Sequence, residues 1–206
     1  MTLKRVEEQY RGLTYTWGRL DHPEETPFQV APGVWWLRFT MPGPLNHINL
    51  WLLEDGDGWT IVDTCLNLET AKAQWESLFD GFMGGKPVKR VICTHMHPDH
   101  IGLAGWLCER FACDLYMTQA EFLTGSLIMG YTGEQAPPAA ISFYHRAGFS
   151  TSQLDNYRDR FGGFGQFTTP LPHNYQRLTD RQTLAIGGRY WQIVVGEGHS
   201  PEHACL

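Results

Sequence analysis

The chain has 206 residues, 42% of them hydrophobic and 18% charged, which is enough for one domain with a sizeable core. Its formal net charge of −6 disfavours a general attraction to nucleic acid or to an anionic membrane. No apolar run is long enough for a membrane span, the charged start lacks the apolar core of a signal peptide, and the five scattered cysteines form no C-x-x-C. We therefore expect a cytoplasmic protein with reduced thiols and no membrane partner.

The first third of the chain predicts strands and then a helix. Residues 1–30 are polar without a clear period and are expected to form an extended arm on the surface. Strands rich in β-branched and aromatic residues are predicted at 33–40 and 47–64, with a hairpin turn at 55–58. Apolar residues at helical spacing predict a helix over 68–83, which Gly84 and Gly85 would stop.

In the rest of the chain, predicted strands and a helix alternate on either side of one region that is helical throughout. Residues 118–167 hold helix-like pieces crowded with aromatic residues, and they are expected to form an inserted helical cap. The other predicted elements are strands at 87–94, 113–118, 182–188 and 189–196 and a helix at 101–111. This alternation predicts α/β layers in a single domain over residues 1–206.

Three histidines and an aspartate lie within residues 94–100, which read Thr-His-Met-His-Pro-Asp-His. Side chains two apart in an extended segment point the same way, so His95 and His97 can face one point at the end of a buried strand. Asp99 and His100 lie on the turn into the next helix and can approach that point from another side. Imidazole nitrogens suit Zn, Fe, Co and Ni, and a carboxylate adds an anionic ligand. The cluster predicts a metal site, and it suits two metals better than one.

Residues 94–100, with the Ile-Gly-Leu-Ala-Gly that follows, closely resemble the signature of the metallo-β-lactamase superfamily. Residues 34–64 resemble its opening hairpin. The superfamily's hairpin ends in Asp-Thr-Gly, whereas this chain has Asp63-Thr64-Cys65. Residues 196–203 resemble its later Gly-His-Thr/Ser-Pro-Gly-His motif, with Glu202 in place of the glycine. The resemblance covers about residues 30–117 and 178–206. It implies an αββα sandwich, here with the helical cap inserted.

The resemblance also implies a role for each residue of these motifs. His95, His97 and His199 correspond to the ligands of a first metal, and Asp99 and His100 to ligands of a second. Two zinc ions are expected in the complete protein, with iron or manganese as alternatives.

Three further residues near the motifs have weaker assignments. Asp63 resembles a buried aspartate that braces the histidine loop, although alone it reads equally as a strand-end cap. His203 resembles a histidine that lies behind the ligands, and a structural role is favoured for His47. No Asp or His follows His203, so we expect the chain to be a fragment of a longer protein. If it is not, His47 or Glu197 must supply the missing ligands.

A metal-bound hydroxide that attacks a carbonyl is the reaction implied by such a site, with Asp99 as both ligand and orienter. No G-x-S-x-G motif supplies a serine nucleophile, and Cys65 and Cys93 are interpreted as small, inert, buried residues. The expected substrate is a small acyl compound: an ester, a thioester or a lactone.

The aromatic cap is the expected source of the substrate pocket, with Phe143, Tyr144 and Arg146 as candidates. The cap arginines and Arg177 would hold the carboxylate or phosphate of glutathione or coenzyme A; they are Arg146, Arg158, Arg160 and Arg177. Alternatively, the aromatic residues are the core of the cap and the arginines its solvated face.

Two other classes of function remain open within the superfamily. Its mononuclear iron sulfur dioxygenases resemble this chain in His95, His97 and His199 but leave the second metal site empty. Its nucleases fit less well, because the chain is acidic and has no basic patch in its sequence.

Overall fold

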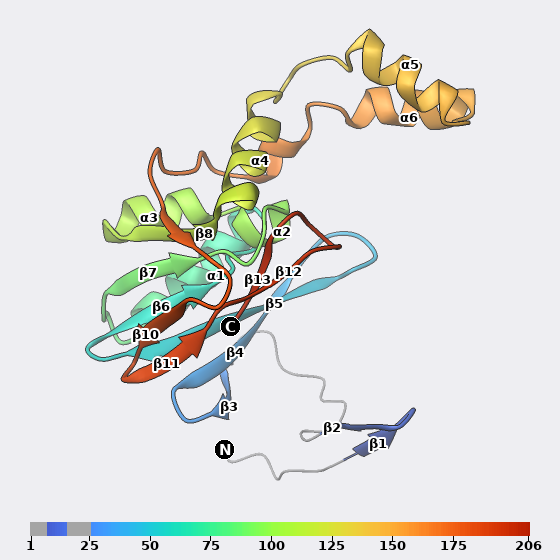
Figure 1. The fold of residues 1–206 in the computed structure, drawn as a ribbon. Coiled ribbons are helices and arrows are strands. Elements are labelled where there is room, and N and C mark those ends of the chain that lie inside the picture. The colour runs from blue at the N-terminus through green and yellow to red at the C-terminus, as the bar shows by residue number, and fades with distance from the viewer. Residues whose placement is uncertain (1–7, 16–25) are drawn as a thin grey trace.

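A computed structural model describes residues 8–15 and 26–206, and its centre is a seven-stranded sheet in the order β3-β4-β5-β6-β7-β8-β9 (Figure 1). Strands β3 to β6 pair antiparallel, and β6 to β9 pair parallel. The seven strands are β3 Phe28–Ala31, β4 Val34–Thr40, β5 His47–Asp55, β6 Gly58–Val62, β7 Val88–Ile92, β8 Asp114–Thr118 and β9 Gln176–Leu178. The strands predicted at 33–40, 47–64, 87–94 and 113–118 are present in this sheet, and the three-residue strand β9 is an addition. The strand predicted at 189–196 is instead divided into residues 189–192 and 194–196, which pair in different hairpins.

The predicted N-terminal arm is partly wrong. Residues 28–31 form the edge strand β3, because they pair with β4 and so satisfy its outer backbone groups. β1 Glu8–Tyr10 and β2 Leu13–Tyr15 form a separate hairpin, and residues 1–7 and 16–25 lie outside the described part of the chain.

One face of the sheet is covered by helices. They are α1 Glu69–Asp80, α2 Pro98–Ile101 and α3 Ala104–Phe111. Trp75 of α1 is fully buried, its ring lies 5.0 Å from that of Phe39, and its indole N–H donates to the Thr64 carbonyl at 3.0 Å. This contact fixes α1 against the end of β6, where the Asp63-Thr64-Cys65 motif lies. The helix ends at Asp80, earlier than the predicted stop at Gly84.

The opposite face of the sheet carries two small hairpins, one formed by β10 with β11 and one by β12 with β13. Their bounds are β10 Thr183–Ile186, β11 Arg189–Gln192, β12 Val194–Gly196 and β13 His203–Cys205. Leu184, Ile186 and Ile193 bury their side chains against Val62 and Ile92 of the sheet. The layers are therefore helix, sheet and strand hairpins, which confirms the predicted α/β layering.

Between β8 and β9 the chain forms the helical region predicted as a cap. It comprises α4 Gln119–Gly130, α5 Pro138–Arg146, α6 Thr151–Arg160 and the 3-10 helix η1 Phe164–Phe167. Figure 1 shows α4 rising from the body beside α2, and the α5–α6 pair projecting away from the sheet. Among residues 8–15 and 26–206, no helix has the length and apolarity needed to cross a bilayer.

Candidate metal centre

Two loops meet at the carboxyl ends of the parallel strands and carry the predicted ligands. The first runs from the end of β7 into α2, and the second joins β12 to β13. The Ala204 N–H of β13 donates to the Thr94 carbonyl at 2.8 Å, which ties the two loops together. Carboxyl ends of neighbouring parallel strands are a common place for binding sites, because several loops converge there.

Three imidazoles from these loops converge on one point. His199 Nε2 lies 3.1 Å from His95 Nε2 and 3.1 Å from His97 Nδ1. The ligand atoms of the three rings lie within 4.8 Å of one another, and they form the only such group of three found in the described residues. Three nitrogen donors around a shared point fit a divalent metal ion.

The environment favours the neutral form of two of these imidazoles, His95 and His97. Burial, together with the neighbouring His100 and His97 rings, lowers the pKa of His95 to about 2. Burial and the adjacent His199 also lower the pKa of His97. Neutral imidazole is the form that binds metal, so the cluster is prepared for a cation that would replace the close nitrogen–nitrogen contacts with coordination bonds.

Asp99 and His100 form a second pair beside this group. The His100 ring centroid lies 3.9 Å from that of His95, and His100 Nε2 lies 3.5 Å from Asp99 Oδ2. Burial lowers the pKa of His100, but the charge and hydrogen bond of Asp63 outweigh burial, so the net shift is upward. The structure thus brings all five predicted ligands to one edge of the sheet.

Asp63 holds the first ligand loop through hydrogen bonds to Thr94 and His100. Its carboxylate accepts the Thr94 N–H at 2.8 Å and the Thr94 hydroxyl at 2.8 Å, and its Oδ2 lies 2.8 Å from His100 Nδ1. With the Nδ1 proton directed at Asp63, the His100 Nε2 lone pair is left for a ligand. Of the two readings of Asp63, the bracing one matches this geometry.

Cys65 has the backbone conformation of the glycine that it replaces. Its φ of 73° lies in the left-handed region that favours glycine. The thiol is fully buried, and burial raises its pKa to about 12; burial also raises the pKa of Cys93. All five cysteines are free, and these two thiols are too weakly acidic to serve as nucleophiles at neutral pH.

A carboxylate that the sequence reading missed joins the two ligand loops. Glu121, in the first turn of α4, is fully buried; its Oε2 accepts the Met96 N–H at 2.9 Å and its Oε1 accepts the Glu202 N–H at 2.6 Å. In return, the Glu202 carboxylate accepts the Ala120 N–H at 2.9 Å. The available signal was that Glu121 is the one charged residue of the helix Gln119–Gly130.

The other candidates near the motif lie at different distances from it. The His203 ring is 4.8 Å from that of His95, and its Nδ1 is 3.5 Å from Cys205 Sγ. His47 Nδ1 instead lies 3.4 Å from Arg38 Nη2, and His47 also contacts Asn46. The structure therefore places the His203 ring next to His95 of the three-histidine group, whereas His47 contacts Arg38 and Asn46.

The structure does not bring the predicted pocket residues to the histidines, and this part of the prediction is corrected. Phe143, Tyr144 and Arg146 lie on α5, which projects away from the body (Figure 1). The Tyr144 ring packs 5.3 Å from Phe143 and 4.7 Å from Tyr157, and Arg146 donates to the Ser142 hydroxyl at 2.7 Å. These ring contacts join α5 to α6, here called the α5–α6 hairpin. They agree with the alternative interpretation, in which the aromatic residues form the core of the cap.

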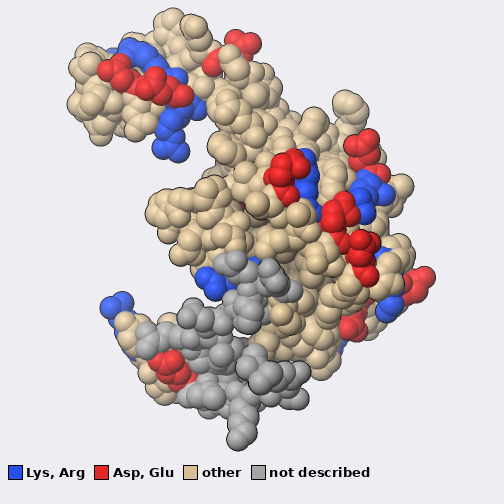
Figure 2. All heavy atoms as spheres, turned by 180° about the vertical axis from the view of Figure 1, so that it is seen from behind, with Lys and Arg blue, Asp and Glu red and all other residues tan. Residues whose placement is uncertain are grey.

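Two of the other predicted arginines, Arg158 and Arg177, lie beside carboxylates. Arg158 pairs with Asp155 at 2.6 Å, and Arg177 shares a hollow of about 510 Å³ with Asp180, Glu197 and Glu202. Figure 2 shows a face on which acidic and basic groups adjoin rather than gather by sign. This distribution gives no support to a nuclease.

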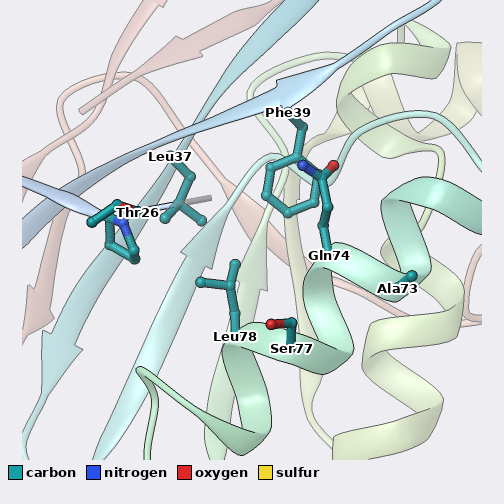
Figure 3. Close-up of a pocket in the computed structure, with 8 residues that line it drawn as sticks. Thr26, Leu37, Phe39, Ala73, Gln74, Ser77 and Leu78 are labelled. Atoms are coloured by element: carbon teal, nitrogen blue, oxygen red, sulfur yellow. The ribbon is translucent and has the colours of Figure 1, made fainter. Parts of the chain in front are cut away.

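A hollow of about 390 Å³ lies between β4 and α1, away from these loops (Figure 3). Leu37 and Phe39 face it from β4, and Gln74, Ser77 and Leu78 face it from α1. The described residues that line it include no histidine, cysteine or carboxylate and so offer no ligand set for a metal.

Known proteins resemble the chain in sequence and in structure. A family model described as the metallo-beta-lactamase superfamily matches residues 43–206. The crystal structure of a beta-lactamase domain protein from Burkholderia ambifaria is 38% identical, with a TM-score of 0.78, and the match covers 92% of this chain and 55% of that one.

Two curated proteins are also similar. The probable metallo-hydrolase YybB of Bacillus subtilis (strain 168) is 27% identical over 176 residues, which are 85% of this chain and 63% of that protein. A linear primary-alkylsulfatase of a Pseudomonas species is 37% identical over 75 residues, which are 36% of this chain and 10% of that enzyme. The chain thus spans little more than half of the solved structure and less than two thirds of the Bacillus protein. The predicted metallo-β-lactamase fold is confirmed, and the chain belongs to the metallo-β-lactamase superfamily.

Proposed function

We propose that the chain carries the active site of a metal-dependent hydrolase of esters, thioesters or lactones. The observation that carries the proposal is the convergence of His95, His97 and His199 beside the Asp99–His100 pair. When bound there, a divalent ion such as Zn²⁺ would lower the pKa of water toward neutrality and supply hydroxide at pH 7.

The residues of the chain have separable tasks in this reaction. The three imidazoles would hold the ion, and His100 and Asp99 would offer a nitrogen and an oxygen for a second one. The Asp99 carboxylate also accepts a hydrogen bond from the attacking water and so orients it. Because the Cys65 and Cys93 thiols stay protonated, attack by water is the route that these side chains favour.

A panel of substrates tests the proposal. Metal-loaded protein is assayed with nitrophenyl esters, glutathione and coenzyme A thioesters, and lactones, after chelation and after return of zinc, iron or manganese. Linear alkyl sulfates join the panel, because the Pseudomonas relative is an alkylsulfatase. We expect metal-dependent release of acid from at least one carbonyl class. A protein that binds metal at the three histidines but hydrolyses none of them contradicts the proposal.

The second candidate is a mononuclear iron sulfur dioxygenase. It is favoured by the fact that, in the described residues, only the three-histidine group brings three ligands together. Metal content and oxygen uptake with glutathione persulfide separate the two candidates. One iron per chain with oxygen uptake supports the oxidoreductase, and two metals per chain with hydrolysis support the hydrolase.

A further inference from the structure

A groove of about 740 Å³ runs along the root of the cap, and one residue of the first ligand loop lines it. Pro98, which lies between His97 and Asp99 in the chain, forms part of its lining. Ile128 lines it from α4, and Tyr131 from the residue that follows α4. Tyr157 lines it from the last turn of α6, and Phe161 from the residue that follows α6. Its volume is typical of small-molecule sites, which span about 300–1,000 Å³.

The walls of this groove are held in place by contacts of their own. The Phe161 ring lies 5.8 Å from Tyr131 and 5.8 Å from Tyr157, and the Gly133 N–H donates to the Gly162 carbonyl at 3.0 Å. Gly162 has a φ of 71°, and a Cβ there would lie 2.6 Å from the Glu134 carbonyl oxygen. Glycine is therefore required where the end of α6 meets the end of α4.

The chemistry of the groove suits an apolar chain. Aromatic and aliphatic side chains form most of its lining, and its charged residues Asp159 and Arg160 have opposite signs. The two other hollows described above suit such a chain less well, because one lies away from the ligands and the other is lined by three carboxylates.

We propose that this groove binds the apolar acyl or alkyl chain of the substrate while the reacting group lies at the histidines. The inference rests on the proposed function and narrows it to substrates with an extended apolar part. Each methylene that enters the groove should raise kcat/KM about three- to fourfold, since burying one CH₂ is worth about 0.8 kcal/mol. The rise should stop once the groove is full.

A matched pair of substitutions on one helix tests the groove. Ile128→Trp fills it, whereas Leu127→Trp places the same ring one position earlier, on a side chain that is 60% exposed and does not line it. With nitrophenyl esters from acetate to decanoate, we expect the wild-type slope of kcat/KM against chain length in Leu127→Trp and a much shallower slope in Ile128→Trp. Metal content and circular dichroism are compared for both proteins. If Ile128→Trp does not fold, Phe161→Ala, which removes one wall, should flatten the slope instead.

Binding of an alcohol separates failure of the groove from failure of the hydrolase. Octan-1-ol has the chain but no scissile bond, and its binding is measured by saturation-transfer NMR on metal-loaded protein. We expect transfer in the wild type and Leu127→Trp and its loss in Ile128→Trp. Octanol binding without any hydrolysis overturns the proposed function and keeps the groove. A wild-type slope in Ile128→Trp, or undiminished octanol transfer, overturns the groove even if hydrolysis is strong.

Discussion

Different kinds of interaction stabilise the two ligand loops and the α5–α6 hairpin. Buried carboxylates hold the loops: Asp63 bonds Thr94 and His100, and Glu121 bonds the backbone of both loops. In α5 and α6, all of whose residues are described, Leu154 alone is buried. The loops therefore depend on contacts between distant parts of the chain, whereas the hairpin depends on contacts within itself.

Helix α4 belongs with the ligand loops rather than with the hairpin. At its N-terminus, the Ala120 N–H donates to the Glu202 carboxylate, and the Glu121 carboxylate accepts the Glu202 N–H. At its other end, Ile128 and the following Tyr131 line the proposed groove. The cap thus has a root that is tied to the metal centre and a tip that is not. Substitutions at the root should change metal binding as well as rate, whereas substitutions in the α5–α6 pair should leave metal binding unchanged.

The largest effect is expected for His97→Ala, with His145→Ala on α5 as the control. Loss of a ligand should lower hydrolysis by more than about 100-fold, since even groups behind metal ligands are worth about 10- to 100-fold. His145 is exposed, and its replacement should preserve metal content and rate. Metal analysis and steady-state rates measure both. Full metal content and turnover in His97→Ala would show that the site is elsewhere.

Asp63→Asn should have the next largest effect. An amide NH₂ directed at His100 would favour the tautomer with the proton on Nε2, which removes that nitrogen as a ligand. We expect affinity for the second metal to fall about 10- to 100-fold in titrations against a chelator.

The matched control for Asp63 is Asp55→Asn, at the last residue of β5, which pairs with Gly58 at the start of β6. Asp55 is also buried, but it pairs with Arg90 at 3.0 Å and accepts the Gly187 N–H at 3.0 Å, far from the ligands. It should lower the free energy of unfolding and leave metal affinity unchanged. Equal losses of affinity in the two variants would mean that Asp63 acts through general stability.

Glu121→Gln should have a smaller effect that reaches both loops. Glutamine has one accepting oxygen, so either Met96 N–H or Glu202 N–H would face an NH₂ group. An unsatisfied buried donor costs about 1–3 kcal/mol of unfolding free energy, and we expect metal affinity to fall about tenfold. Denaturant unfolding and metal titration measure the two effects, with Glu109→Gln on the exposed side of α3 as the control. Loss of stability with unchanged metal affinity would deny Glu121 a role in placing the ligands.

The same contrast explains what could be predicted from sequence. His95, His97, Asp99 and His100 were found because ligation demands particular side chains at local spacings, and the strands beside them follow a strong apolar pattern. Glu121 was missed because its role depends on where α4 lies relative to two loops that are distant in sequence. Phe143 was predicted as a pocket residue because the sequence does not distinguish an aromatic side chain that packs between two helices from one that faces a groove. Strand β9 has three residues and no pattern of its own.

The smallest effect on the metal centre is expected for Leu154→Ala. Removal of a buried leucine costs about 2–5 kcal/mol, and here that loss falls on a hairpin held by its own ring contacts and by the Ser150–Gln153 capping box. We therefore expect the hairpin to open locally while the sheet stays folded. Hydrogen exchange read by mass spectrometry should show lost protection over residues 138–160 and unchanged protection over β5 to β7, with metal content retained. Phe143→Ala, at a side chain that is 58% exposed, should lose less protection in the same peptides. If the sheet peptides lose protection together with the hairpin, the two regions unfold as one unit, and the division between root and tip is wrong.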